Sequence, residues 1–267
     1  MNSIFDITPT AGFSAAVSAD PGQPYLSHHN VGAPLLGTVM SLEAMAECAA
    51  HFCGRAPKGI VAVTAGKDCL IPAAKELLFT AEAGSDTFRA CLTDGDDLLF
   101  SCTFSFASPA APAPQIPPIG AFPVTAETVY NCFFHGPAFR VVDRAQLSGD
   151  TLISRFNPAI PPLTLDPFRT SILPVRAIEF CLQTAGLLDI ALHRYLSVPL
   201  SVGEVRLYQT DDMAGLWAQA QKNGPGTDIH AFNRLGQAVL SVLDYRTKPM
   251  PYESRELEAL HQSFQPL

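Results

Sequence analysis

The chain has 267 residues, a formal net charge of −8, 48% hydrophobic residues and 16% charged residues. This composition indicates a folded protein with a sizeable core, in one large domain or two small fused ones, and excludes a disordered chain. No block of Lys or Arg interrupts the acidic balance, which argues against nucleic acid and against an anionic membrane surface as partners.

The N-terminal stretch and the cysteines both bear on where the protein works. The first ten residues, MNSIFDITPT, lack the basic and apolar regions of a signal peptide, and no run reaches the ~18 apolar residues that span a bilayer. The seven cysteines are scattered without a C-x-x-C pair, which is typical of reduced core cysteines and not of zinc ligands. We therefore expect a cytoplasmic protein without a metal site.

The first half of the chain is expected to form one helix followed by antiparallel strands. Residues 1–24 form a lead-in with Pro, Gly and Ser and a few apolar anchors. After a Gly/Pro loop, apolar residues at i, i+3, i+4 spacing predict a helix that begins near Thr38 or Val39 and stops at Gly54. The Asp94-Gly95 pair is a strong hairpin signal. Strands are expected at 59–64, 70–71, 76–82, 87–93 and 98–106.

A proline-rich segment separates the two halves. Residues 107–123, ASPAAPAPQIPPIGAFP, hold six prolines and are expected to form an extended linker. A similar order of elements follows, with an apolar helix after Pro174. The polar residues beyond Lys248 are expected to be a peripheral tail. Strands are expected at 133–146, 151–156, 200–208, 216–221, 228–233 and 238–245, with a Pro-rich loop at 158–167.

The repeated order of elements predicts an internal structural duplication. Glu43 and Glu179 take comparable places in the two helices, 179 − 43 = 136 residues apart, about half of the chain. Both helices are too apolar to lie exposed. We therefore expect an α+β architecture in which antiparallel sheets wrap around both helices.

Two kinds of side chain in this pattern suit proton transfer. His29 lies in a tight loop with Gly32 and Pro34, just before a helix whose N-terminal N–H groups can polarise a bound carbonyl. On the second helix, Glu179 is followed by Gln183 one turn on; a buried carboxyl group has the raised pKa that a general acid needs. The alternative for His29 is a loop histidine that is structural or solvated. The alternative for Glu179 and Gln183 is that they lie on an edge of the helix that faces solvent.

Two further features have stronger structural explanations. Glu43 and Glu47 repeat the i, i+4 pair on the first helix, where solvated or salt-bridged carboxylates are the simpler expectation. The segment FFHGPAF at 133–139 is typical of a strand end that is followed by a Gly-Pro turn, with aromatic side chains in the core. Other templates are absent: the sequence has no G-x-S-x-G, no P-loop, no G-x-G-x-x-G and no H-E-x-x-H.

Several of these stretches resemble one enzyme superfamily. HNVGAPLLGTVMSLEAM, from His29 to Met45, resembles the motif of fatty-acid-synthesis dehydratases, in which a His is followed by Gly, Pro and Pro-Gly and then by a helix with an acidic residue fourteen positions on. FHGPAF, the Glu179-to-Gln183 spacing and PLSVGEVRLY at 199–208 resemble the second half of dehydratase domains from polyketide and polyunsaturated-fatty-acid synthases. The resemblance covers residues 20–247 and implies a double hotdog: an N-terminal hotdog at 1–106, a linker at 107–123, a C-terminal hotdog at 124–247 and a tail at 248–267.

The sequence departs from the family pattern at three places. Gly37 and Thr38 stand where the family has Pro-Gly. The loop is one residue shorter than the polyketide version, so alignment through Gly32 favours His28 as the base, whereas alignment with the fatty-acid motif favours His29, which we choose. Glu179 replaces the Asp of the synthase domains, although fatty-acid dehydratases include Glu users. These departures are also compatible with a domain of this family that has lost its catalytic activity.

The resemblance implies dehydration of a 3-hydroxyacyl thioester on acyl carrier protein to a trans-2-enoyl thioester. His29 would remove the α-proton, Glu179 would protonate or orient the departing hydroxyl, and Gln183 would hold the carboxylate. His28 and Glu43 are secondary candidates. Substrate and thioester oxygen would be bound by residues near the first helix and in the FHGPAF motif, namely Pro34, Gly37, Thr38, His135, Gly136 and Pro137.

The implied partners are acyl carrier protein, whose phosphopantetheine carries the substrate, and other polyketide or fatty-acid synthase proteins. No metal, redox cofactor, nucleic acid or membrane is implied, and a homodimer is compatible with the family. Three alternatives stay open. The first is an enzyme in which the same His/acid pair isomerises a double bond or directs cyclisation. The second is a hotdog thioesterase, which would use Glu43 to activate water. The third is a non-catalytic domain that holds an assembly together and binds the carrier protein.

Overall fold

The computed structural model describes residues 3–116, 120–208 and 215–265, and the chain divides into two compact units. The first unit comprises Met1–Ser108 together with His135–Phe139 and Pro161–Val175; the second comprises Pro109–Phe134, Arg140–Ile160 and Arg176–Leu267. Two segments from beyond the proline-rich linker thus belong to the first unit. The domain boundaries expected from the sequence stay a prediction.

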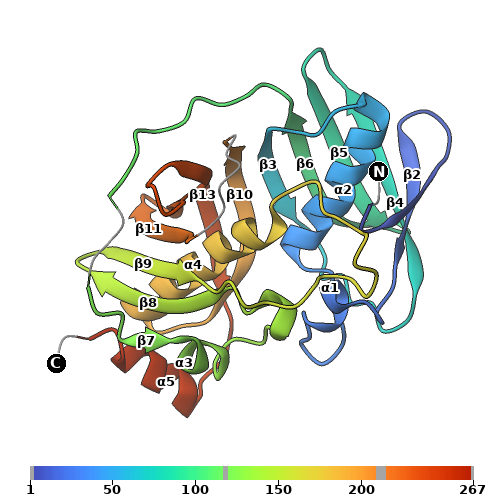
Figure 1. The fold of residues 1–267 in the computed structure, drawn as a ribbon. Helices are drawn as coiled ribbons and strands as arrows, with labels where there is room; N and C mark the ends of the chain where they lie inside the picture. The colour runs from blue at the N-terminus through green and yellow to red at the C-terminus, as the bar shows by residue number, and fades with distance from the viewer. Residues whose placement is uncertain (1–2, 117–119, 209–214, 266–267) are drawn as a thin grey trace. The chain divides into compact units, whose positions relative to one another are not determined.

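The first unit contains one antiparallel sheet with helix α2 against it (Figure 1). Its strand order is β1-β2-β4-β5-β6-β3. The Asp94-Gly95 hairpin joins β5 to β6 as expected, with Gly95 at a φ of +59°. The elements of this unit are β1 (Asp6–Pro9), β2 (Ser14–Ala19), α1 (Pro24–Ser27), α2 (Thr38–Cys53), β3 (Gly59–Ala65), β4 (Lys75–Ala83), β5 (Thr87–Asp94), β6 (Asp97–Ser105) and a 3-10 turn, η1 (Pro137–Phe139).

Two expectations for the first unit are wrong. The lead-in contains strands β1 and β2, which extend the sheet beyond β4. The sequence of β2, SAAVSA, has small residues that alternate between buried and partly buried positions, a weak signal because Ala and Ser are not typical of strands. The expected strand at 70–71 is only an isolated bridge from Leu70 to Leu35.

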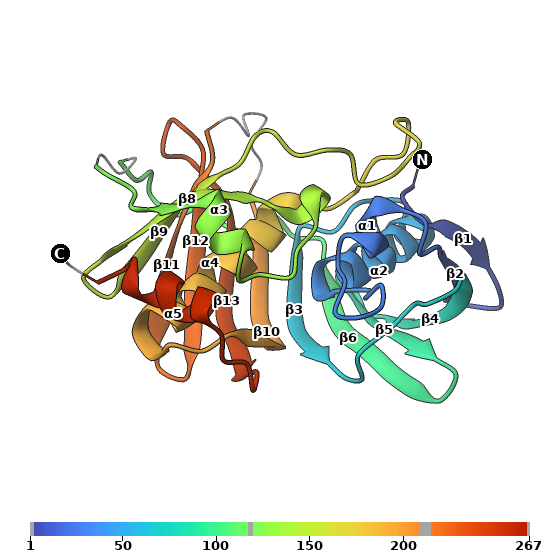
Figure 2. The same cartoon turned by 90° about the horizontal axis from the view of Figure 1, so that it is seen from below.

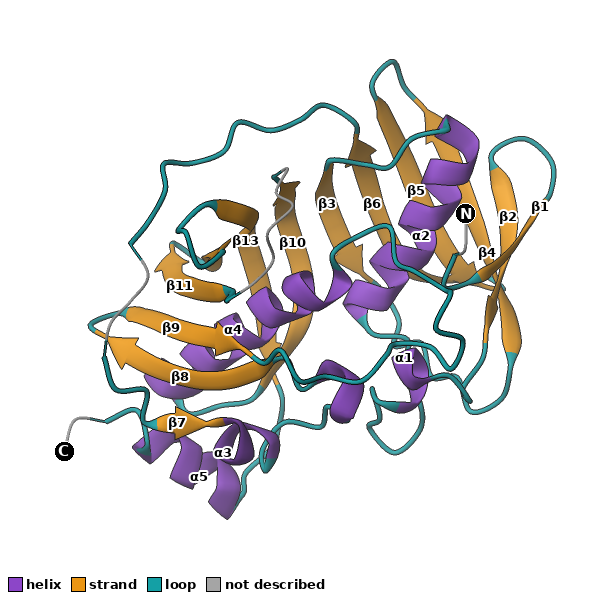
Figure 3. Ribbon diagram, in the orientation of Figure 1, coloured by secondary structure: helices purple, strands orange, loops and turns teal. Residues whose placement is uncertain are grey.

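Helix α2 begins and ends where the sequence predicts. It follows Gly37 and stops at Gly54, which adopts a left-handed conformation with a φ of +68°. Every residue from Val39 to Ala50 is buried, so the helix has no exposed face over this stretch. Figure 3 draws α2 as a purple helix against the orange strands of its unit. Helix α2 packs on β5 and β6, and the ring of Phe52 stacks with those of Phe79 and Phe88.

The second unit repeats this topology. Its strand order is β10-β13-β12-β11-β9-β8-β7, and helix α4 follows β9 in the chain as α2 follows β2 (Figure 2). The elements are β7 (Val124–Thr125), α3 (Ala126–Tyr130), β8 (Val142–Ser148), β9 (Thr151–Phe156), α4 (Val175–His193), β10 (Ser197–Leu207), β11 (Trp217–Asn223), β12 (Gly226–Phe232), β13 (Ala238–Pro249) and α5 (Arg255–Gln262).

Six strands of the second unit match those of the first position by position, and β7 has no counterpart. Along the chain, each unit has a strand pair, a long helix, a single strand and then a three-stranded meander, so β1-β2-β4-β5-β6-β3 corresponds to β8-β9-β11-β12-β13-β10. This confirms the duplication expected from the order of elements. A β-rich α+β fold is also confirmed. Glu43 and Glu179 both lie in the second turn of their helix.

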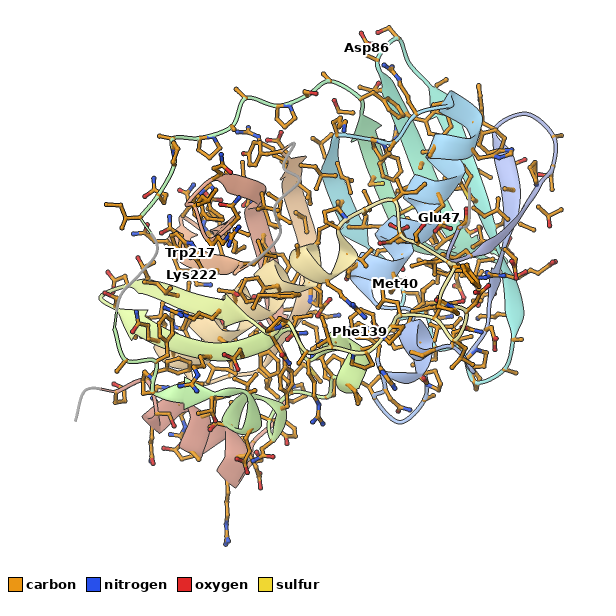
Figure 4. All side chains as sticks on the ribbon, viewed as in Figure 1. Met40, Glu47, Asp86, Phe139, Trp217 and Lys222 are labelled. Atoms are coloured by element: carbon orange, nitrogen blue, oxygen red, sulfur yellow. The ribbon has the colours of Figure 1, made fainter. Side chains whose placement is uncertain are left out.

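Helix α4 is tied to its own sheet by polar groups as well as by apolar packing. Phe180 meets Phe156 of β9 edge to face, and Thr184 hydrogen-bonds Ser154 at 2.6 Å. Nearer the helix end, the buried carboxylate of Asp189 accepts from Lys222 on β11 at 2.5 Å. It also accepts from the hydroxyls of Ser197 and Thr247 at 2.7 and 2.8 Å. Figure 4 marks Lys222 on β11.

Three further outcomes concern the second half of the chain. The expected strand at 133–146 is wrong in its first part, because β8 begins only at Val142 and residues 137–139 form the turn η1. The expected linker contains no helix or strand in its described residues, 107–116 and 120–123. The segment expected to be peripheral contains helix α5, whose Leu257 and Leu260 are buried and which packs on α3. Residues 1–2 of the lead-in, 117–119 of the linker and 266–267 of the tail lie outside the described residues.

Among the described residues, no helix is both long enough and apolar enough to cross a bilayer.

Candidate active site

The histidine loop lies between helices α1 and α2; the sequence predicts the loop and α2, but not α1. The loop is tight: the N–H of Leu35 donates to the carbonyl of His29 at 2.7 Å, and Gly32 has a φ of +99°, which favours glycine. Pro34 is fixed through its carbonyl, which accepts from the N–H of Ile71 at 2.7 Å. Gly37 and Thr38 then start helix α2.

His28 is engaged in holding the HGPAF segment. Its Nδ1 accepts a hydrogen bond from the N–H of Ala138 at 2.9 Å, and its carbonyl accepts from the N–H of Gly136 at 2.7 Å. A Cβ on Gly136 would lie 2.8 Å from the Cβ of His28, closer than side chains pack, so this position requires glycine. Because Nδ1 acts as an acceptor, neutral His28 carries its proton on Nε2.

His29 lies at the centre of the residues that the sequence singled out in this unit. Its buried imidazole meets the ring of His135 at a centroid distance of 5.0 Å and that of Phe139 at 4.0 Å. A Cβ on Gly37 would lie 3.4 Å from its Nε2, so the backbone at the start of α2 packs against the ring. Figure 4 marks Phe139 beside α1. The structure thus brings His29, His135 and Gly37 together.

The remaining motif residues of this unit support that cluster from outside. Gly136 precedes Pro137, the first residue of the turn η1, and the N–H of Phe139 donates to the carbonyl of Gly136 at 3.0 Å. Residues 28 and 135 are more than a hundred positions apart, so this arrangement depends on a long-range contact. The imidazoles of His29 and His135 are groups that could bind a metal ion, although the sequence predicts no metal site.

In the second unit, Glu179 is held by a chain of hydrogen bonds. The amide Nε2 of Gln183 donates to Glu179 Oε1 at 2.8 Å, as the i, i+4 spacing suggested. The phenol of Tyr130 donates to Gln183 Oε1 at 2.8 Å, and the N–H of Val142 donates to the phenol oxygen at 2.7 Å. Glu179, Gln183 and Tyr130 are all buried. Tyr130 lies outside every sequence motif given above, 53 positions from Gln183, so the sequence does not predict its role.

Glu43 and Glu47 anchor two distant segments of the first unit. Glu43 accepts from the N–H groups of Ile172 and Leu173 at 2.6 and 2.9 Å, and Glu47 accepts from those of Ile4 and Phe5 at 2.6 and 3.0 Å. Burial, aided by the neighbouring charge of Glu47, raises the pKa of Glu43 well above its ordinary value, and burial also raises the pKa of Glu47. The solvated or salt-bridged pair expected from the sequence is wrong: both carboxyl groups are buried and accept backbone N–H groups.

Comparison with solved structures finds one recurrent class. The dehydratase domain from the CurF module of curacin polyketide synthase superposes with a TM-score of 0.73 at 15% identity, over 92% of this chain and 98% of that one. The dehydratase domain of PpsC from Mycobacterium tuberculosis, in complex with C12:1-CoA, gives 0.71 at 16% identity, over 93% and 98%. That of RzxB from Pseudomonas fluorescens gives 0.70 at 19% identity, over 91% and 96%.

No family model matches the sequence, and no curated protein matches it either. The chain thus has the fold of polyketide synthase dehydratase domains, at a sequence identity that shows the fold alone.

Proposed function

We propose that this protein is a dehydratase that removes water from a 3-hydroxyacyl thioester to give a trans-2-enoyl thioester. The observation that carries the proposal is the packing of His135, Phe139 and the backbone of Gly37 around the buried imidazole of His29. Similarity to dehydratase domains supports it, and with it the assignment of each unit as a hotdog, an antiparallel sheet wrapped around one long helix.

The proposed base is His29. Histidine is the side chain whose protonation changes closest to neutral pH, so a neutral imidazole can take the proton from C2 of the substrate. His28 is less suitable, because its Nδ1 already accepts from Ala138. As the C2–H bond breaks, charge develops on the thioester oxygen, and N–H groups at the start of the 16-residue helix α2, near Gly37 and Thr38, would stabilise it.

The proposed acid is Glu179. As the C3–O bond breaks, the proton of its carboxyl group passes to the departing hydroxyl, which leaves as water. The reaction ends with a protonated His29 and an ionised Glu179, and proton exchange with solvent restores both. Gln183 holds the carboxyl group through the 2.8 Å hydrogen bond to Oε1. This mechanism uses acid–base groups of the chain itself and requires no metal or redox cofactor.

The proposed substrate is carried by acyl carrier protein. The C12:1-CoA in the PpsC structure is an acyl thioester of the kind that such a reaction interconverts. We propose that the phosphopantetheine of the carrier presents the 3-hydroxyacyl group here, as part of polyketide or fatty-acid type synthesis. No observation favours the thioesterase alternative, because both oxygens of Glu43 accept backbone N–H groups.

Replacing Glu179 by Gln tests the acid. The amide keeps the shape of the side chain but cannot give up a proton to the leaving hydroxyl, so we expect the dehydration rate to fall about 10²- to 10³-fold. Chromatography of the products from a carrier-bound 3-hydroxyacyl substrate measures the rate. Glu253→Gln, in the exposed part of the tail, is the matched control and should keep the wild-type rate. A wild-type rate in Glu179→Gln would refute the assignment.

A further inference from the structure

A relay of directed hydrogen bonds runs from a backbone N–H of the second unit to Glu179. Val142 N–H donates to the oxygen of Tyr130, Tyr130 donates to Gln183 Oε1, and Gln183 Nε2 donates to Glu179 Oε1, at 2.7, 2.8 and 2.8 Å. The three side chains lie on helices α3 and α4, and all three are buried.

The direction of this relay is set by its first member. A backbone N–H can only donate, so the phenol oxygen of Tyr130 must accept from Val142. The phenol proton is then directed to Gln183, and it requires an oxygen there. A flipped amide would place a second N–H donor against the phenol oxygen and would leave the phenol proton without its acceptor. The carboxamide oxygen of Gln183 therefore faces Tyr130, and its NH₂ group faces Glu179.

We propose that Tyr130 is a positioning residue that, by fixing the orientation of the Gln183 amide, places the acidic proton of Glu179 on Oε2. This inference rests on the proposed function for its catalytic consequence. Glu179 Oε1 accepts an N–H, and in a protonated carboxyl group the carbonyl oxygen is the better acceptor, so the proton belongs on the other oxygen. An acid that donates to a leaving hydroxyl needs its proton on the oxygen that is not occupied by Gln183.

The surroundings of Tyr130 keep its ring in place. The guanidinium of Arg140 lies over the ring at 5.5 Å from its centroid, and the ring of Phe133 meets it edge to face at 6.5 Å. Burial raises the pKa of the Tyr130 phenol, so it stays a donor at neutral pH. The phenol is thus a positioning group and does not itself exchange protons.

Tyr130→Phe separates this role from simple packing. Without the phenol, the Gln183 amide can turn its oxygen to Glu179 and accept the acidic proton, which directs that proton away from the substrate. We expect kcat to fall about tenfold with KM changed less than twofold, since a hydrogen bond near 1.4 kcal/mol corresponds to a factor of ten. The limb of the pH profile of kcat/KM that reports Glu179 should move up by ~1 pH unit, because the ionised form of Glu179 has lost a donor.

A double-mutant comparison identifies the route of the effect. In a Gln183→Leu background, Tyr130→Phe should change kcat less than twofold further, because the group through which Tyr130 acts is gone. Tyr208→Phe is the matched control: Tyr208 is also a buried tyrosine of this unit, and its hydroxyl bonds Ser241 at 3.1 Å. It should keep the wild-type kcat and pH profile. Equal losses from Tyr130→Phe with and without Gln183 would overturn the proposal.

A titration that needs no activity distinguishes this inference from the proposed function. The carboxyl carbon of Glu179 can be followed by ¹³C NMR against pH, with Glu179→Gln to assign the signal. We expect its pKa to be higher in Tyr130→Phe than in the wild type by ~1 unit. Absence of dehydration with this shift present would refute the function and keep the relay. An unchanged Glu179 pKa in Tyr130→Phe would refute the relay, whatever the activity.

Discussion

His29→Ala is expected to lower the rate of dehydration by ~10³-fold or more, because it removes the group that takes the α-proton. Without this base, the proton on C2 must pass to water. The buried surroundings of residue 29 restrict the access of water. The measurement is single-turnover conversion of a carrier-bound 3-hydroxyacyl substrate. Release of α-deuterium from a labelled substrate should stop as well, since the same step removes that atom.

The neighbouring histidine supplies the control for this prediction. In His28→Asn, the side-chain oxygen of asparagine can take the place of Nδ1 and accept the N–H of Ala138, so the HGPAF segment should keep its position. We expect this variant to retain most of the activity. If His28→Asn were inactive and His29→Ala active, His29 would not be the base.

Glu43→Ala is expected to have a large effect on stability and to lower the free energy of unfolding by ~3 kcal/mol. The substitution leaves the N–H groups of Ile172 and Leu173 without their acceptors, and each buried unsatisfied N–H costs ~1–3 kcal/mol. Relief of repulsion with Glu47 offsets part of this loss. Urea unfolding followed by circular dichroism measures it. Glu253→Ala, at an exposed tail position, should leave the transition unchanged.

The same carboxyl pair should make stability depend on pH. Burial raises the pKa of both Glu43 and Glu47 above the ordinary value of 4.5, so the folded state holds protons that the unfolded chain releases. Their contribution is therefore fully present below pH 4.5 and is lost as pH rises through the folded-state pKa values. Glu47→Gln removes one titrating group and should make the fall shallower. A steeper fall in this variant would contradict the shared titration.

The sequence predicts those features that short-range patterns control. Gly54 ends helix α2 because its left-handed conformation suits glycine, and Asp94-Gly95 forms a hairpin for the same reason. The duplicated topology follows from helices that are apolar on all sides and therefore need a sheet around them. The i, i+4 contact of Glu179 with Gln183 follows from helical geometry.

Features that depend on distant partners could not be predicted in this way. The aromatic run before His135 suggested a strand, but Gly136 and Ala138 bond to His28 instead, and a turn results. The sequence predicts a solvated or salt-bridged Glu43, but its partners are backbone N–H groups that lie 129 and 130 positions away. Tyr130 gave no signal because a tyrosine in a short helix becomes informative only beside Gln183.

The central claim, elimination of water by this protein, is tested most directly by mass spectrometry of intact acyl carrier protein loaded with 3-hydroxyacyl chains of several lengths. With the wild-type protein, we expect carriers of at least one length to lose the mass of one water, and with His29→Ala we expect them to keep it. Carriers that lose the whole acyl group would indicate a thioesterase. Carriers unchanged at every length would contradict the dehydratase proposal and favour a structural domain.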